Sequence, residues 1–134
     1  LSGGERQRLT IARAILAEQP ITMFGDGSTA RDYTFVEDIV NGILGAIRRI
    51  ENAPDKLYEI YNLGNSHPIT LREMIHKLEI ALGKPARIKR QAMQAGDVEI
   101  TFADVSQAKR MLGYRPQTSF EDGLESFADW LKKS

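Results

Sequence analysis

The sequence predicts a mixed α/β fold in which helices and strands alternate as in an α+β protein. Aliphatic residues recur every three or four positions over residues 36–50, which predicts a helix of about four turns with one apolar face. Short runs rich in β-branched and aromatic residues, such as residues 58–63, are set off by glycine and proline. With 134 residues, 42% of them hydrophobic, the chain can build one modest core, so we expect a single compact domain over residues 1–134.

The chain is organised around residues 24–39, which read FGDGSTARDYTFVEDI. The two glycines allow a tight reversal with positive φ, and the Tyr-Thr-Phe run favours an extended strand. Thr34 and Glu37 have the spacing of a capping box, in which a threonine hydroxyl and a glutamate three residues later satisfy the first N–H groups of a helix. The stretch therefore predicts a strand, a turn, a second strand and the start of a helix.

Further helices and strands are expected along the rest of the chain, each bounded by glycine or proline. Thr70 and Glu73 form another capping box, for a helix that ends at Gly83. Residues 87–91 predict a strand with basic side chains facing outward. Two more helix starts are expected, at Asp104 with Gln107 and at Ser119.

Composition excludes several classes of function. Eighteen basic residues balance eighteen acidic ones, so we expect neither nucleic acid nor an anionic membrane as a partner. The chain has no cysteine, and its histidines, His67 and His76, lack the spacing of metal ligands, so we expect no metal. No apolar run approaches the roughly 20 residues of a membrane span, and no leader is recognisable, so we expect a cytoplasmic protein.

Arg31 is the candidate phosphate-binding residue. A guanidinium on a short strand beside a glycine-rich turn suits bidentate contact with phosphate oxygens. The alternative is a surface arginine paired with Asp32 or Glu37, and the charge pattern alone favours that alternative.

A family resemblance favours the phosphate-binding role of Arg31 over the surface role. The stretch ITMFGDGSTARDYTFVEDIVNGILGAI resembles the segment that opens the substrate lobe of extended short-chain dehydrogenases acting on nucleotide sugars, in particular UDP-glucuronate 4-epimerase-like enzymes. The similarity continues through YNLGNSHPITLREMIHKLEIALGK and MQAGDVEITFADVSQAKRMLGYRPQTSFEDGLESFADWL, and so covers residues 17–134. It implies the C-terminal substrate lobe of that fold without its dinucleotide-binding half.

The resemblance also implies a nucleotide-sugar site. In the family, the counterpart of Arg31 grips the diphosphate and that of Asp97 contacts the nucleotide ribose. Gln94 stands where related enzymes often place a second arginine. Met23 and Phe24 match the edge of the uracil pocket, although plain core packing explains them equally well. The expected ligand is therefore UDP or a UDP-sugar, bound weakly.

The first sixteen residues, LSGGERQRLTIARAIL, resemble the signature motif and following helix of ABC-type ATPases. In that family the residues matching Ser2, Gly3 and Gly4 meet the γ-phosphate of a nucleotide held by the opposite subunit. The phosphate loop G-x-x-x-x-G-K-[ST] is absent, so we interpret residues 1–16 as a grafted helix and the chain as a designed or recombined chimera. Ser2 and Glu5 also form a capping box, so a structural role for the motif is favoured. The predicted buried face of this helix comprises Leu9, Ala12 and Leu16, with Ile11 and Ile15 beside it.

The sequence lacks the parts on which catalysis depends. Epimerases of the resembling family use a G-x-x-G-x-x-G loop to hold NAD and a Y-x-x-x-K pair for proton transfer. Neither motif occurs: the four tyrosines are followed at the fourth position by Glu37, Asn62, Asn65 and Thr118. We therefore expect no cofactor, no catalytic residue and no turnover in this chain.

Two other functions and one partner remain to be considered. The chain is alternatively an ABC ATPase fragment that contributes its signature motif to a partner carrying a phosphate loop, or a purely structural product of fold recombination.

In the parent fold, the strand at residues 58–63 joins the dinucleotide-binding sheet that this chain lacks. Its unpaired edge predicts a homodimer.

Overall fold

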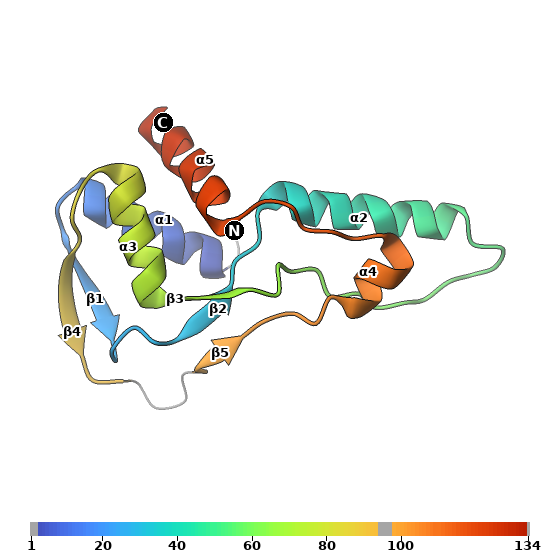
Figure 1. Ribbon diagram of the computed structural model, residues 1–134, viewed down its shortest axis with the longest axis horizontal. Coiled ribbons are helices and arrows are strands. Elements are labelled where there is room, and N and C mark those ends of the chain that lie inside the picture. The colour runs from blue at the N-terminus through green and yellow to red at the C-terminus, as the bar shows by residue number, and fades with distance from the viewer. Residues whose placement is uncertain (1–2, 94–97, 134) are drawn as a thin grey trace. The chain divides into compact units, whose positions relative to one another are not determined.

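The computed structural model describes residues 3–93 and 98–133, and these residues form the predicted mixture of helices and strands (Figure 1). They divide into two compact units. The sequence predicts that both units belong to a single domain, and this stays a prediction. Unit 1 comprises Leu1–Ala30, Ile69–Glu99 and Glu121–Ser134, and unit 2 comprises Arg31–Pro68 and Ile100–Phe120.

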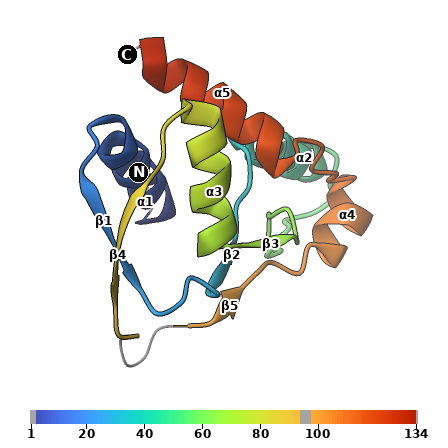
Figure 2. The same ribbon diagram turned by 60° about the vertical axis from the view of Figure 1, so that its left-hand side comes forward.

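Unit 1 contains a pair of parallel strands. β1 (Pro20–Phe24) pairs with β4 (Arg87–Gln91) along its full length, with Phe24 opposite Gln91. The two strands lie side by side in Figures 1 and 2. α1 (Gly3–Leu16) contacts both β1 and α3 (Leu71–Leu82). The expected strand over residues 87–91 is thus confirmed, and its side chains are all exposed.

The helix α3 forms as its sequence predicts. The hydroxyl of its N-cap, Thr70, accepts a hydrogen bond from the Glu73 N–H at 3.1 Å. Its C-cap, Gly83, has a φ of 68°, a left-handed conformation that glycine adopts without strain. Its apolar face is buried and comprises Met74, Ile75, Leu78 and Leu82.

The first helix packs through the predicted apolar side, but the contact is centred on the residues expected beside that face. Ile11, Ala12 and Ile15 are buried, whereas Leu9 and Leu16 are only half-buried. The helix contacts two elements, β1 and α3. Periodicity located the apolar side of the helix but not the centre of its contact.

The last helix, α5 (Phe120–Lys133), begins directly after Ser119, the residue at which its start was expected. It buries Leu124 and Ala128. Within unit 1, Glu121 pairs with Lys77 of α3, and the Lys132 ammonium donates a hydrogen bond to the Ala81 carbonyl at 2.9 Å. These polar contacts join α5 to α3.

Unit 2 contains the longest helix, α2 (Val36–Glu51), which contacts α4 (Ser106–Leu112) (Figure 1). The face of α2 that packs on this unit carries Gly42 and Gly45, both buried. A Cβ at Gly45 would lie 3.1 Å from the Leu112 carbonyl oxygen. Glycine therefore allows the two helices to approach closely.

The capping box predicted for α2 is wrong. The N-cap of this helix is Phe35, and no side-chain hydrogen bond caps it. Thr34 precedes the N-cap by one residue, so its hydroxyl is out of register with the first N–H groups of the helix. Glu37 and Asp38 lie in the first turn, where negative charge favours the helix dipole.

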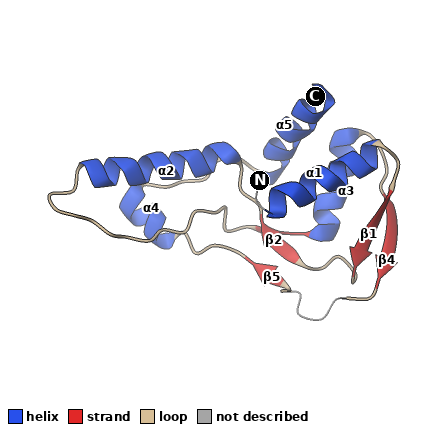
Figure 3. Cartoon of the chain, turned by 180° about the vertical axis from the view of Figure 1, so that it is seen from behind, coloured by secondary structure: helices blue, strands red, loops and turns tan. Residues whose placement is uncertain are grey.

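Residues 58–63, predicted as a strand, are drawn as loop in Figure 3. Tyr58 and Ile60 are 88% and 70% exposed, whereas Glu59 and Tyr61 are half-buried. The segment keeps the alternation of a strand, but no strand among the described residues pairs with it. The prediction fails because a strand needs a partner that this part of the chain does not supply.

Three short strands complete the fold. β2 (Ala30–Asp32), β3 (Pro68–Thr70) and β5 (Ile100–Thr101) pair in the order β3-β2-β5. The chain passes between the two units within or next to these strands, and again at the start of α5, between Phe120 and Glu121. Within residues 3–93 and 98–133, every helix is too short or too polar to span a lipid bilayer.

Candidate functional site

Arg31, the expected diphosphate ligand, is half-buried on β2 in unit 2. The next residue, Asp32, fixes the strand in place, because its carboxylate accepts three backbone hydrogen bonds. The donors are the N–H groups of Asn65 at 3.1 Å, Ser66 at 2.9 Å and Ala103 at 3.2 Å. Hydrogen bonds to an ionised carboxylate are among the stronger ones in proteins. The backbone that carries Arg31 is therefore firmly positioned.

Gly64 makes room for this carboxylate. A Cβ at Gly64 would lie 2.6 Å from both the Asp32 Oδ2 and the Ala103 Cβ. The Gly64 carbonyl accepts a hydrogen bond from the buried Tyr114 hydroxyl at 3.0 Å. Burial, and then the carboxylates of Asp38 and Asp32, raise the pKa of Tyr114, so this hydroxyl stays a donor at neutral pH.

A pocket of about 360 Å³ opens beside the Asp32 carboxylate in unit 2. Its lining includes Thr34, Asn62 and the exposed ring of Phe102. Successive side chains of a strand point to opposite faces, so Arg31 faces away from this pocket on β2. The pocket is therefore separate from the expected phosphate contact.

Met23 and Phe24 lie together on β1 in unit 1. Met23 is 1% exposed, and a Cβ at Gly27 would lie 2.9 Å from its sulfur, so core packing accounts for this residue. Phe24 is half-buried opposite Gln91 and keeps part of its ring accessible. The turn that follows has the predicted positive φ values, 69° at Gly25 and 82° at Gly27.

The other expected ligands cannot be placed in the same way. Gln94 and Asp97 lie outside the described residues. The structure thus brings Met23 and Phe24 together, and it places Arg31 in the other unit. For the ATPase-like motif, Ser2 lies outside the described residues, and Gly3 and Gly4 begin α1.

Arg72 is a structural residue that the sequence analysis missed. Its guanidinium donates a hydrogen bond to the Asp26 carbonyl at 2.8 Å and lies 3.6 Å from the Asp26 carboxylate. Its own N–H donates to the Gly27 carbonyl at 3.0 Å, and the Leu71 N–H donates to the Thr29 carbonyl at 2.8 Å. The N-terminus of α3 is therefore satisfied by the turn after β1 and is not offered to an anion.

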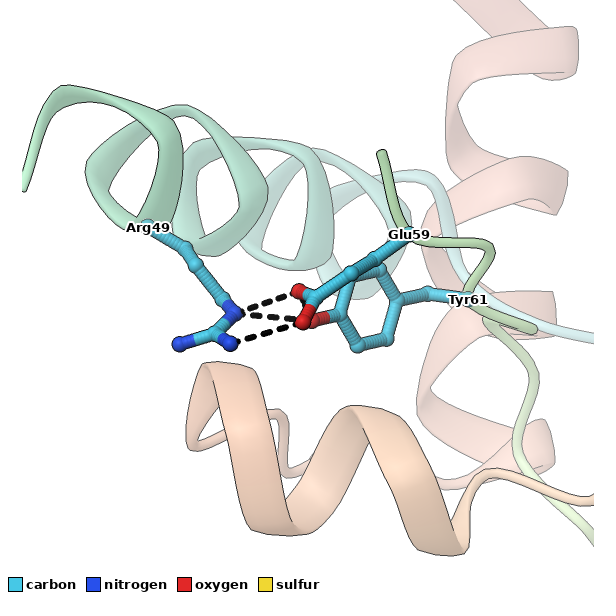
Figure 4. Close-up of polar contacts among 3 residues, drawn as sticks. All are labelled: Arg49, Glu59 and Tyr61. Carbon is cyan, nitrogen blue, oxygen red and sulfur yellow. Dashed lines mark hydrogen bonds and ion pairs between the residues drawn. The ribbon is translucent and has the colours of Figure 1, made fainter. Parts of the chain in front are cut away.

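A second missed group lies in unit 2, where Arg49, Glu59 and Tyr61 form a polar cluster (Figure 4). The Arg49 Nε and Nη2 donate to the Glu59 carboxylate at 2.5 and 2.7 Å, and Nε also lies 2.9 Å from the Tyr61 oxygen. The Tyr61 hydroxyl donates to Glu59 as well. Hydrogen bonds from Arg49, and then from Tyr61, lower the pKa of Glu59 to about 2.

This cluster holds residues 59–61 against α2. The hydrogen bond to Glu59 raises the pKa of Arg49, so the pair stays charged over the neutral range. Glu59 and Tyr61 are two positions apart in an extended segment and therefore share one face, which is the only signal of this cluster in the sequence. Its partner Arg49 comes from α2 and could not be inferred from spacing.

Within residues 3–93 and 98–133, the glycine turn after β1 differs from a dinucleotide loop. A dinucleotide loop leads from a strand into the N-terminus of a helix, whereas the glycine turn after β1 leads into β2. Across residues 3–93 and 98–133, histidine, aspartate and glutamate side chains form no group of three that could hold a metal ion.

Comparisons with known proteins identify the family. A family model described as GDP-mannose 4,6 dehydratase matches residues 5–127. A UDP-glucuronate 4-epimerase of Thermodesulfobacterium geofontis is 37% identical over 121 residues, which make up 90% of this chain and 36% of that protein. An uncharacterized protein of Methanocaldococcus jannaschii is 42% identical over 120 residues, 90% of this chain and 35% of that protein. The chain spans little more than a third of the length of these relatives.

Solved structures confirm the fold class. The UDP-glucuronic acid 4-epimerase of Bacillus cereus, in complex with UDP-glucuronic acid and NAD, matches with a TM-score of 0.79 and 31% identity over 92% of this chain and 38% of that one. The UDP-glucose 4-epimerase of Thermotoga maritima, with UDP-glucose, matches with a TM-score of 0.82 and 26% identity over 95% of this chain and 39% of that one. The chain therefore has the fold of one part of a larger epimerase.

The comparisons change the interpretation of the first helix. The family match begins at Glu5 and includes most of α1, which we interpreted as a graft from an ABC-type ATPase. They support the epimerase-like part of the interpretation and give no support to an ABC ATPase segment or to a chimera. The chain belongs to the GDP-mannose 4,6 dehydratase family.

Proposed function

We propose that this chain forms part of a nucleotide-sugar-binding site and that its ligand is UDP or a UDP-sugar. The observation that carries the proposal is the position of Arg31 on a strand that the Asp32 carboxylate anchors through three backbone hydrogen bonds. A guanidinium on a strand that is held in this way is suited to bidentate contact with a diphosphate. The relatives solved with UDP-glucuronic acid and UDP-glucose support this choice of ligand.

In this proposal the 134 residues do not catalyse epimerisation by themselves. The chain contains neither the glycine-rich dinucleotide loop nor a Tyr-x-x-x-Lys pair, and it spans 36% of the length of an epimerase relative. NAD and the proton-transferring pair would come from the part of the relatives' length that this chain does not match. With part of the site missing, we expect roughly millimolar affinity at best. The cytoplasmic location also stays a prediction.

The role that we propose for α1 is structural. Its residues Ile11, Ala12 and Ile15 are buried, and the helix contacts β1 and α3. We therefore expect no ATP hydrolysis, and we expect Ser2→Ala to change only stability, by about 1 kcal/mol through loss of an N-cap. Phosphate release that disappears in Ser2→Ala would favour the ATPase fragment instead.

A titration of the labelled chain with UDP, followed by NMR, tests the proposed ligand. We expect chemical shift changes at Arg31, Phe24 and Asp97, and a Kd raised roughly tenfold or more in Arg31→Gln, because charge-assisted hydrogen bonds to phosphate are lost. Arg115→Gln, which removes an exposed arginine of unit 2, is the matched control. Shifts that map elsewhere, or equal losses in both variants, would contradict the proposed site.

A further inference from the structure

The carboxylate of Asp32, which anchors β2, is itself held by a group of residues in unit 2. The Asn65 N–H donates to its Oδ1, and the N–H groups of Ser66 and Ala103 both donate to its Oδ2. Gly64 precedes these donors and leaves room for the carboxylate. We call this group the carboxylate clasp; it comprises Gly64, Asn65, Ser66 and Ala103.

The peptide group that joins Gly64 to Asn65 is held at both ends. Its N–H, that of Asn65, donates to the Asp32 Oδ1 at 3.1 Å, and its carbonyl, that of Gly64, accepts from the Tyr114 hydroxyl at 3.0 Å. A trans peptide group is planar, so its N–H and C=O point in opposite directions. Rotation of this group would break both hydrogen bonds. The Tyr114 hydroxyl therefore keeps the Asn65 N–H directed at the carboxylate.

The ring of Tyr114 is a rigid support for this contact. It is 3% exposed and packs in the core of unit 2 with Val105 and Ala108. The Tyr114 N–H also donates to the Ala108 carbonyl at 3.2 Å, just after the C-cap of α4. Because a tyrosine has few side-chain torsions, a packed ring fixes the position of its hydroxyl.

Ser66 completes the carboxylate clasp in a strained conformation. Its φ is 60°, in the left-handed region that residues other than glycine rarely adopt. Its hydroxyl donates to the Ala103 carbonyl at 2.7 Å, so the two residues that share the Asp32 Oδ2 are also bonded to each other. Backbone strain of this kind persists only where surrounding contacts hold it, and it occurs most often at functional sites.

We propose that Tyr114 is a positioning residue for nucleotide-sugar binding by Arg31. Its hydroxyl orients the Gly64–Asn65 peptide group, this group orients the Asp32 carboxylate, and Asp32 directly follows Arg31 on β2. Bidentate contact between a guanidinium and a diphosphate depends on direction as well as distance, so a small rotation of β2 weakens it. This role rests on the proposed function, and Tyr114 itself touches no ligand.

Titration of the 134-residue chain with UDP, followed by NMR, tests this role. We expect Tyr114→Phe to raise the Kd roughly threefold, because one neutral hydrogen bond that orients the site is lost. Tyr61→Phe is the matched control: it removes a hydroxyl bonded to Glu59 from a ring that packs against the same core, and it leaves the Kd unchanged. Circular dichroism verifies that both variants are folded. An unchanged Kd in Tyr114→Phe, or an equal rise in Tyr61→Phe, overturns the proposal.

Amide hydrogen exchange of the ligand-free chain tests the positioning directly. In Tyr114→Phe we expect faster exchange at the Asn65 and Ser66 N–H groups than at other amides of unit 2, because their bonds to the Asp32 carboxylate open more often. In Tyr61→Phe these two amides exchange as in the unaltered chain. Equal exchange rates in the two variants overturn the proposal.

A second variant tests the carboxylate clasp from its other side. Ser66→Ala removes the hydroxyl bond to Ala103 but keeps the N–H that donates to Asp32, and we expect it also to raise the Kd for UDP roughly threefold. Arg31→Gln separates the two proposals. If it weakens UDP binding while Tyr114→Phe and Ser66→Ala do not, the nucleotide-sugar site stands and the positioning role is wrong. If Arg31→Gln changes nothing, the proposed function is wrong and the positioning role falls with it.

Discussion

The helices α2 and α3 have similar sequences in one respect and opposite surroundings in the structure. Both carry aliphatic residues at intervals of three and four. In α3 the apolar face is buried, with Leu78 0% exposed, whereas in α2 the corresponding face is open, with Leu44 44% exposed. Amphipathic periodicity thus shows which side of a helix is apolar, but it does not show whether the same chain covers that side.

The difference arises from what holds each helix. α3 is held by burial of its apolar side chains and by the turn after β1. α2 is held through glycines that allow close approach and through polar contacts, such as the cluster of Arg49 with Glu59 and Tyr61. Replacing matched residues on the two helices therefore separates the contribution of burial from that of polar contacts.

The largest difference is expected between two leucines. Leu78→Ala leaves a cavity in the core of unit 1 and should lower the free energy of unfolding by about 2 to 5 kcal/mol. Leu44→Ala removes a side chain that is already partly in water and should change it by roughly 0.5 kcal/mol or less. Urea unfolding measures both. Equal losses would mean that the Leu44 side chain is packed as tightly as that of Leu78.

Much of the fold could be predicted because the decisive signals are local. The caps of α3 at Thr70 and Gly83, the turn with Gly25 and Gly27, and the strand at residues 87–91 each depend on residues close together in the sequence. The strand expected at residues 58–63 could not be decided locally, because strand pairing needs a second segment.

Local signals in the sequence were also too few to predict the candidate site. Its expected residues came from a family resemblance, and composition or spacing alone favoured an ordinary surface role for Arg31. The contacts of Asp32 with Ser66 and Ala103 cross long stretches of chain and leave no pattern in the sequence. Carboxylates that bind backbone N–H groups of distant segments are recognised only when the segments that they join are known.

A smaller difference is expected between two threonines. Thr70→Ala removes the side chain that caps α3 and should destabilise the chain by about 1 kcal/mol. Thr34→Ala changes a residue that does not cap α2 and should cost clearly less. Thermal unfolding of the two variants side by side measures the difference. If Thr34→Ala lowered the stability as much as Thr70→Ala, Thr34 and not Phe35 would be the cap of α2.

The smallest effect is expected from acid on the polar cluster of α2. In the folded chain the pKa of Glu59 is about 2, below the usual value of a glutamate. Glu59 therefore contributes stability above about pH 4.5 and loses that contribution as the pH falls through about 2. In Glu59→Gln, this part of the acid dependence should disappear. Urea unfolding between about pH 5 and about pH 2.5 measures it, with Glu51→Gln, at the end of α2, as the control for loss of one charge. An unchanged acid dependence in Glu59→Gln would show that the cluster adds nothing to stability.

The carboxylate of Asp32 also has a consequence for the order of folding. Its three hydrogen bonds close loops of 33, 34 and 71 residues. Contacts between distant residues form late, because the entropy of closing long loops must be lost before they are made. Arg31 therefore reaches its final position only when most of unit 2 has assembled, and a partly folded chain has no diphosphate contact to offer. A ligand that binds Arg31 only in the folded state would in turn stabilise unit 2 against unfolding.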